Sequence, residues 1–182
     1  MEKTNSLTGV LQQKSWQRKA GIIVSMLLLC AFFAIMSDKF LTKNNLTNII
    51  LQSSINGTIA LGMTLVIITG GIDLSVGSVM ALSGMVAAKM MVAGIPAGVA
   101  LIAALLLGIL CGVCNGLFIS LLHLQPFLVT LGTMSVFRGL TLIISDGLPV
   151  RGLDANFLNA MNSLNKSIPV PVIILLTLTI IL

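Results

Sequence analysis

Long apolar runs alternate with short polar or glycine-containing breaks along almost the whole chain after residue 20. A helix needs about 20 mainly apolar residues to cross a hydrocarbon core of about 30 Å. The pattern therefore predicts an all-α fold, a polytopic transmembrane helical bundle with about six spans, the last of them incomplete. The predicted spans are Gly21–Met36, Leu46–Thr69, Leu74–Val92, Ala97–Leu122, Pro126–Ser145 and Ile168–Leu182.

The polar segment before the first apolar run carries four of the ten basic residues of the chain, Lys3, Lys14, Arg18 and Lys19. It does not fit a cleaved signal peptide, because the apolar run after it lacks a small-x-small cleavage site. Basic residues next to a span favour the cytoplasmic side of the membrane. We therefore predict a cytoplasmic tail over residues 1–20 and a transmembrane domain over residues 21–182.

Two features mark the C-terminal part. The connection Ser145–Ser167 is the longest polar one, and the alternation of sides places it outside, where it is a natural docking surface for an extracytoplasmic partner. The apolar run Ile168–Leu182 reaches the last residue without a polar stop or a basic flank, which finished spans normally have. The sequence is therefore expected to be truncated within its sixth span.

Composition excludes a water-soluble domain. Of the 182 residues, 57% are hydrophobic and 8% are charged, with a mean hydropathy of +1.10, whereas soluble domains carry about 25% charged residues. Membrane lipid is the solvent that such a surface fits. The net charge of +5 is too scattered along the chain for nucleic-acid binding.

The three cysteines predict no disulfide framework, because they are odd in number and lie within apolar runs. Cys111 and Cys114 have the spacing of a redox or metal pair. No second Cys or His pair follows, so a role in helix packing is favoured, and no metal or cofactor is predicted. His123 is interpreted as a polar residue of a turn.

The segment Gly70–Ser78 interrupts the apolar pattern with three glycines, two serines and one acid. We predict a tight turn between two membrane helices, in which Gly70 and Gly71 end one helix with positive φ. Asp73 can cap the next helix by accepting backbone N–H bonds. Two compatible interpretations remain open: a cap alone, or a pathway for a polar solute that Asp73 lines together with Ser75 and Ser78.

The second predicted span has a polar first half, and polar side chains are costly when they face lipid. We expect them to face other helices or a cavity, with packing and solute contact both open. Asn56 is the candidate for solute contact, since its amide both donates and accepts. Asn45 is a plausible N-cap of this helix. The polar residues are Gln52, Ser53, Ser54, Asn56 and Thr58.

Arg138 lies within the fifth predicted span, where an arginine is a functional-site candidate. The alternative is that it extends to the interface and pairs with Asp146, about 12 Å along the helix axis. Lys89 is expected at the outer end of the third span. In the fourth span, Gly108, Gly112 and Gly116 are typical of closely packed helices.

Several stretches resemble the permease subunits of bacterial ABC importers for monosaccharides, with the ribose permease as the nearest member and the xylose, arabinose and galactose permeases as relatives. The resemblance begins near Asn44 and keeps order and spacing to the fifth span. The stretches are Asn44-Asn45-Leu46, Gly62-Met63-Thr64-Leu65-Val66, Gly70-Gly71-Ile72-Asp73-Leu74-Ser75-Val76-Gly77-Ser78, Pro126-Phe127-Leu128-Val129-Thr130-Leu131-Gly132, Arg138-Gly139 and Asp146-Gly147-Leu148-Pro149-Val150.

The resemblance implies a subunit without a catalytic site of its own, in a bacterial inner membrane. Two permease subunits, in a homodimer, would form the path for the sugar. A periplasmic sugar-binding protein would deliver the sugar, and a cytoplasmic ABC ATPase would drive transport. Members of the family are longer than this chain and continue with further helices.

Two other classes of function make different demands on the sequence. An ion-coupled carrier or channel for a small polar solute predicts several buried acids or a proton relay, and the sequence offers only Asp73 for this role. A membrane redox enzyme that uses Cys111 and Cys114 predicts further cofactor ligands. The sugar permease is therefore the favoured interpretation, and the candidate residues are Asn56, Asp73, Ser75, Ser78 and Arg138.

Overall fold

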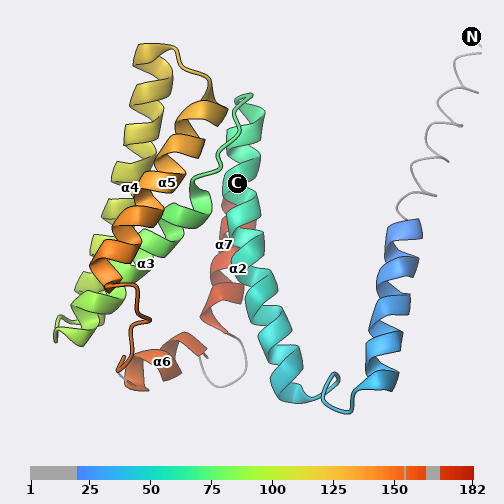
Figure 1. Ribbon diagram of the computed structural model, residues 1–182. Coiled ribbons are helices and arrows are strands. Elements are labelled where there is room, and N and C mark those ends of the chain that lie inside the picture. The colour runs from blue at the N-terminus through green and yellow to red at the C-terminus, as the bar shows by residue number, and fades with distance from the viewer. Residues whose placement is uncertain (1–19, 154, 163–168) are drawn as a thin grey trace, which may run out of the picture. The chain divides into compact units, whose positions relative to one another are not determined.

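The computed structural model describes residues 20–153, 155–162 and 169–182, and all regular structure in these residues is helical. Three helices are long and apolar enough to cross a membrane: α2 (Lys43–Ile68), α4 (Ala97–Leu122) and α5 (Pro126–Ser145). The shorter apolar helices are Ala20–Met36, α3 (Val76–Val92) and α7 (Val170–Ile181). The predicted all-α fold with several apolar spans is confirmed. After Ala20–Met36 come α2 (Lys43–Ile68), α3 (Val76–Val92), α4 (Ala97–Leu122), α5 (Pro126–Ser145), α6 (Ala155–Asn162) and α7 (Val170–Ile181) (Figure 1).

The predicted and observed boundaries agree at α4 and α5 and differ elsewhere by a few residues. The predicted cap of the second span is wrong: Asn45 lies inside α2, and its Nδ2 donates a hydrogen bond of 2.8 Å to the carbonyl of Phe40. The short helix α6 was not predicted, because eight residues are too few for an apolar run. The predicted tail, apart from Ala20, lies outside the described residues.

The chain divides into two compact units, residues 1–50 and 51–182. In the first unit, the turn after Ala20–Met36 is held by local bonds, including one of 2.7 Å from the Thr42 hydroxyl to the carbonyl of Lys39. The rings of Phe33 and Phe40 stack with centroids 5.9 Å apart. This unit contributes a turn between two helices and the first residues of α2.

In the second unit, α3, α4 and α5 pack against one another (Figure 1). Their core contains Leu82 of α3, Cys111 of α4 and Phe137 of α5, with Val79 and Leu107 partly buried beside it. Cys111 therefore packs as expected, whereas Cys114 is exposed. The segment between α2 and α3, residues 69–75, is called the break below.

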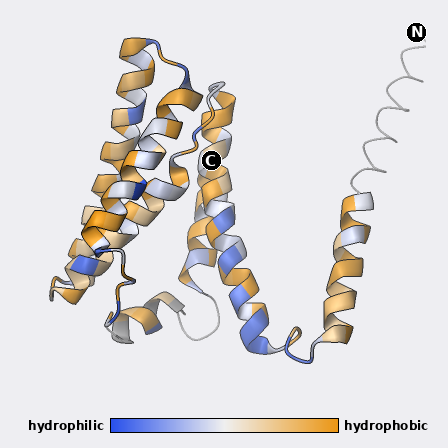
Figure 2. Ribbon diagram, viewed as in Figure 1, coloured by the Kyte–Doolittle hydropathy of each residue, from blue (hydrophilic) through white to orange (hydrophobic). Residues whose placement is uncertain are grey.

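Much of the apolar surface of these helices remains uncovered. On α4, for example, the side chains of Leu105, Ile109 and Leu121 are each more than 60% exposed. Figure 2 shows that hydrophobic residues dominate α4 and α5, while hydrophilic residues gather in the first half of α2. Such surfaces suit lipid or further protein rather than water.

The remaining helices of the second unit pack more sparsely. α6 lies against α7. In α2, a Cβ added at Gly57 would lie 3.0 Å from Cδ2 of Leu175, so this glycine lets α7 approach α2 closely. Gly57 thus acts as a helix-packing residue of α2.

Candidate functional site

The end of α2 is built by glycine. Gly70 has φ +78°, a left-handed conformation that favours glycine. The N–H of Gly70 bonds the carbonyl of Ile67 at 2.9 Å, and the N–H of Gly71 bonds the carbonyl of Val66 at 3.1 Å. This pair of bonds satisfies carbonyls that the last helical turn leaves free. The positive φ predicted for Gly70 is confirmed, while Gly71 does not share it.

The segment after Gly71 is not the predicted tight turn. It runs back along the bundle without regular secondary structure, and α3 begins well below the end of α2 (Figure 1). The side chain of Thr130 on α5 makes this possible. Its hydroxyl accepts the N–H of Leu74 at 3.1 Å, and its single proton is shared between the carbonyls of Ile72 at 3.1 Å and Pro126 at 2.9 Å. Thr130 thus supplies hydrogen bonds that a helix would otherwise provide.

The position of Ser75 gives the depth of this segment. Ser75 bonds Asn115, which lies seven residues before the end of α4 at Leu122, a distance of about 10 Å along the helix axis. Irregular backbone at such depth is tolerated in membranes only where it is buried in protein or lines a cavity. The break therefore carries polar groups into the apolar bundle.

Asp73, Ser75 and Asn115 form one chain of hydrogen bonds. Asp73 Oδ1 accepts two hydrogen bonds from Ser75, one of 2.7 Å from the backbone N–H and one of 2.6 Å from the side-chain hydroxyl. The Ser75 hydroxyl in turn accepts Asn115 Nδ2 at 2.8 Å. The predicted cap is wrong: Ser75, and not Asp73, is the N-cap of α3, and the backbone N–H that Asp73 accepts is that of Ser75, which precedes the first helical residue, Val76.

These groups are shielded from solvent to different degrees. Ser75 is 0% exposed, Thr130 is 2% exposed and Asn115 is 4% exposed, while Asp73 is half-buried. Ser78 is also buried and donates to the carbonyl of Ser75 at 2.7 Å. Because hydrogen bonds to a carboxylate are stronger than neutral ones, the chain fixes the carboxylate of Asp73 at the surface of the buried cluster.

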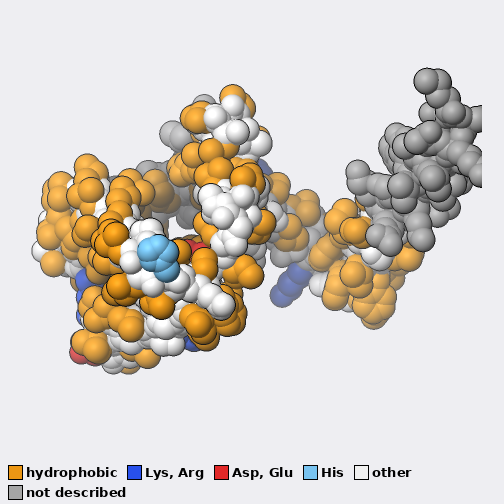
Figure 3. All heavy atoms as spheres, turned by 90° about the horizontal axis from the view of Figure 1, so that it is seen from above, with side chains coloured by type: hydrophobic (Ala, Val, Ile, Leu, Met, Phe, Trp, Pro, Cys, Tyr) orange, Lys and Arg blue, Asp and Glu red, His pale blue; other side chains and the backbone are white. Residues whose placement is uncertain are grey.

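Two hollows border this carboxylate. The first has a volume of about 440 Å³ and lies between the end of α2, the break, α4 and the start of α5. The second has a volume of about 300 Å³ and lies between α3 and α4. Asp73, Gly112 and Asn115 line both hollows. Seen along the bundle from the end that carries the single histidine, an acidic side chain is visible in an opening bordered by hydrophobic side chains (Figure 3).

The glycine row of α4 therefore does not have the predicted packing role throughout. A Cβ added at Gly108 would lie 3.7 Å from the Ser83 hydroxyl, an ordinary packing contact. At Gly112 and Gly116, an added Cβ would meet nothing within 4 Å, and both residues line the first hollow. Two of the three glycines leave space rather than bring helices together.

The cluster leaves two acceptors without donors. Asn115 Oδ1 is buried and has no hydrogen-bond partner among the described residues. Both hydrogen bonds to the carboxylate of Asp73 go to Oδ1. Its second oxygen, Oδ2, therefore has no donor among the described residues. The site therefore holds two oxygen atoms that can accept hydrogen bonds from a ligand.

The predicted site residues divide into two groups. Asp73, Ser75 and Ser78 come together at the break. Asn56 on α2 and Arg138 on α5 are exposed, and neither lines the two hollows.

The predicted partner of Arg138 was wrong. Lys89 of α3, not Arg138, pairs with Asp146 at 3.9 Å. Asp146 lies beyond the last residue of α5 with φ +54°, so its carboxylate leaves the helix and lies near α3 rather than above Arg138.

Sequence reasoning missed Asn115 and Thr130. The available signal for Asn115 was an amide within the otherwise apolar run Ala97–Leu122, between Gly112 and Gly116. For Thr130 the signal was weaker, because threonine in a span commonly bonds its own helix.

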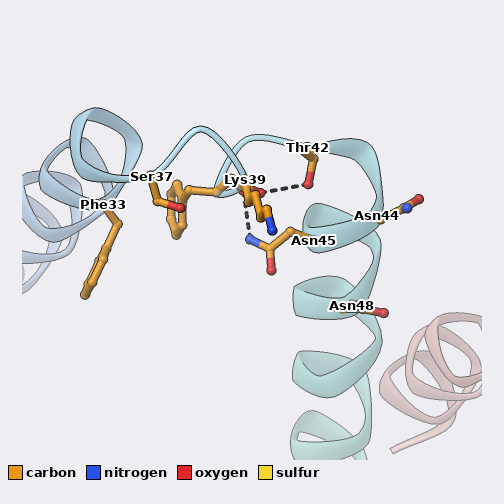
Figure 4. A pocket seen from close by; sticks show the side chains of 8 residues that line it. Phe33, Ser37, Lys39, Thr42, Asn44, Asn45 and Asn48 are labelled. Carbon is orange, nitrogen blue, oxygen red and sulfur yellow. Dashed lines mark hydrogen bonds between the residues drawn. The ribbon is translucent and has the colours of Figure 1, made fainter.

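A separate hollow of about 630 Å³ lies in the first unit, beside the turn that precedes α2. Figure 4 shows Asn45 directed toward the turn, while Asn44 and Asn48 project from other sides of the helix. The side chain of Asn45 is held by Phe40, and the lining residues do not converge on one point. This surface is therefore a weaker candidate than the break.

Comparison with known proteins points to one family. Residues 45–182 match the sequence model of the family described as branched-chain amino acid transport system / permease component. The chain is 41% identical over 168 residues to the D-allose transport system permease protein of Escherichia coli, covering 92% of this chain and 52% of that protein.

Two further relatives are import permeases. The chain is 41% identical to the ribose import permease protein of Bacillus subtilis, over 86% of this chain and 47% of that protein. It is 33% identical to the galactose/methyl galactoside import permease protein of Salmonella typhimurium, over 79% and 47%. The chain thus spans about half the length of these curated relatives. No solved structure matches it.

Proposed function

From the premise that the chain belongs to the permease family whose sequence model matches residues 45–182, we propose that it acts in an ATP-driven importer. In this role it is a membrane-spanning permease subunit that forms the path for a monosaccharide such as ribose across the bacterial inner membrane. It performs no chemistry itself, because ATP hydrolysis belongs to a partner subunit.

The observation that carries the proposal is the identity of 41% to both a D-allose and a ribose permease. The family description names branched-chain amino acids, whereas the relatives named above are permeases for sugars.

The proposed importer has the usual parts of its class: a second permease subunit in a homodimer, a cytoplasmic ABC ATPase and a periplasmic sugar-binding protein. The N-terminus is proposed to be cytoplasmic because four basic residues precede residue 20. Lipid surrounds the subunit, and nucleic acid is no partner.

A chimera tests this function. The segment of the Escherichia coli ribose permease that matches this chain, 43% identical over 137 residues, is replaced by the residues of this chain. The chimera is produced in a strain that lacks the native permease but retains the ATPase and the binding protein. We expect uptake of labelled ribose to return, and to stop when the ATPase is inactivated.

Two outcomes would contradict the proposal. In the first, the chimera reaches the membrane at the native level, measured by immunoblot, but restores uptake of neither ribose, allose nor galactose. In the second, uptake continues without a working ATPase and stops with an uncoupler of the proton gradient. The second outcome would indicate an ion-coupled carrier.

A further inference from the structure

We propose that Asp73 and Asn115 form a binding site for the hydroxyl groups of the transported solute within a single subunit, on the glycine face of α4. The solute class rests on the proposed function, whereas the position and chemistry of the site rest on the residues themselves. Asp73 Oδ2 and Asn115 Oδ1 each accept a hydroxyl proton from the solute.

The first argument is the balance of donors and acceptors. The Asn115 amide nitrogen donates a hydrogen bond to the Ser75 hydroxyl, and the Ser75 hydroxyl donates one to Asp73. What remains free is one oxygen of Asp73 and the Oδ1 of Asn115, which is buried without a partner among the described residues. A buried acceptor without a donor lowers the stability of the folded chain. A ligand that donates hydrogen bonds removes this loss, and an anion does not.

The second argument concerns which ligand the two free oxygen atoms bind: the hydroxyl groups of a sugar or a metal cation. The described residues contain no group of three or more His, Cys, Asp and Glu side chains that could hold a metal ion, and Asp73 is the single acid of the two hollows. The walls of the first hollow are largely apolar and include Val66, Ile72, Ile119 and Pro126. A sugar ring presents C–H groups as well as hydroxyls, and so suits a wall of this kind.

The third argument is the space that glycine provides. Gly112 and Gly116 stand on either side of Asn115 in sequence, and a Cβ at either position would enter open space. The first hollow, at about 440 Å³, falls within the range of about 300–1,000 Å³ usual for small-molecule sites. Larger side chains at these positions would fill the hollow without disturbing helix packing.

Protection from alkylation tests the site directly. The exposed cysteines are replaced (Cys30→Ala and Cys114→Ala), the buried Cys111 is kept, and Gly112→Cys is introduced. The chain is reconstituted in lipid nanodiscs, and the rate of modification by N-ethylmaleimide is measured with and without D-ribose. With ribose at about ten times its dissociation constant, we expect the rate at position 112 to fall about tenfold.

Matched variants control the result. Gly62→Cys on α2 also meets nothing within 4 Å but lies outside both hollows, so ribose should not change its rate. Asn115→Leu added to Gly112→Cys should abolish the protection, which is measured as the ratio of the rates without and with ribose in the same variant. If Gly112→Cys does not elute as a single species, Gly116→Cys takes its place.

The proposed site would be overturned if N-ethylmaleimide did not modify position 112, or if the rate were the same with and without ribose. It would also be overturned if, without ribose, the rate were lower in sodium chloride than in choline chloride, because the ligand would then be a cation. The test is independent of transport. Protection without uptake in the chimera would retain the site and overturn the proposed function, whereas uptake without protection would retain the function and overturn the site.

Discussion

The second unit contains two polar regions within apolar helices, and they are built differently. The first region combines residues of the break with residues of two neighbouring helices: Asp73 and Ser75 belong to the break, Asn115 to α4 and Thr130 to α5. Hydrogen bonds join the break to both helices. In residues 52–58 of α2, polar residues follow one another along one helix. There, the Thr58 hydroxyl donates to the backbone of its own helix at 3.0 Å, and Asn56 is exposed.

The comparison teaches that polar content does not by itself make a site in a membrane helix. Residues 52–58 of α2 include more polar residues than the break, yet none of them lines either hollow beside Asp73. A site forms where the backbone leaves the helix and side chains from other helices replace its hydrogen bonds. Mutations at the two regions should therefore differ in effect.

The largest effect is expected for Asp73→Ala. It removes the acceptor of both the N–H and the hydroxyl of Ser75, which is fully buried. Hydrogen bonds to a charged group contribute about 1.5–3 kcal/mol each, so we expect a loss of about 3 kcal/mol of stability and loss of sugar uptake. Thermal unfolding in detergent measures the first, and uptake by the chimera measures the second.

Asp73→Asn is the matched control, because it keeps an oxygen at Oδ1. We expect it to unfold closer to the parent chain than Asp73→Ala does. If it also transports poorly, the charge contributes to solute contact beyond the turn. Unchanged unfolding and uptake in Asp73→Ala would show that the hydrogen-bond chain is unimportant.

A smaller effect is expected for Thr130→Val, which keeps the shape of the side chain. The N–H of Leu74 and the carbonyl of Ile72 lose their bonds of 3.1 Å. An unsatisfied buried group costs about 1–3 kcal/mol. We expect the melting temperature to fall and the break to become more accessible to hydrogen exchange. Thr133→Val is the control, since the Thr133 hydroxyl bonds only its own helix, at 3.4 Å.

Equal exchange at Leu74 in the parent and in Thr130→Val would contradict the role of Thr130. Equal loss of stability in Thr133→Val would show that any threonine of α5 has this effect, and that the bond to the break is not special.

The sequence predicted what depends on local pattern. The apolar runs predicted the spans, and the glycine and aspartate at positions 70 and 73 predicted a helix end and a contact with backbone N–H groups. Partners distant in sequence could not be predicted: Thr130 lies 56 residues from Leu74, and Asn115 lies 40 residues from Ser75. To predict these contacts, one must know that the break runs back into the bundle. No local sequence pattern indicates this path of the backbone.

The same reason explains the wrong predictions. Helix spacing suggested that Arg138 pairs with Asp146, but the positive φ of Asp146 takes it out of the helix. A row of glycines indicates close packing only where another helix is present, and at Gly112 and Gly116 the neighbouring space is open.

A small effect is expected for Lys89→Met. Its pair with Asp146 has a distance of 3.9 Å, and the two side chains are 43% and 82% exposed. Exposed ion pairs contribute about 0–1 kcal/mol, so the melting temperature should stay close to that of the parent at both low and high salt. Asp146→Asn serves as the control from the other side of the pair. A marked loss of stability in either variant, removed by salt, would show that this pair joins α3 to α5.

The smallest effect is expected for Asn56→Leu, and this variant tests the comparison most directly. Asn56 was predicted to contact the solute, but it is exposed on α2 and lines neither hollow. If the solute binds at Asp73 and Asn115, then Asn56→Leu leaves both the melting temperature and the protection of Gly112→Cys by ribose unchanged. Asn115→Leu makes the same chemical change at the break and removes the protection. Should Asn56→Leu remove it as well, the polar half of α2 would belong to the site, and exposure of a side chain within this chain would be a poor guide to contact with the solute.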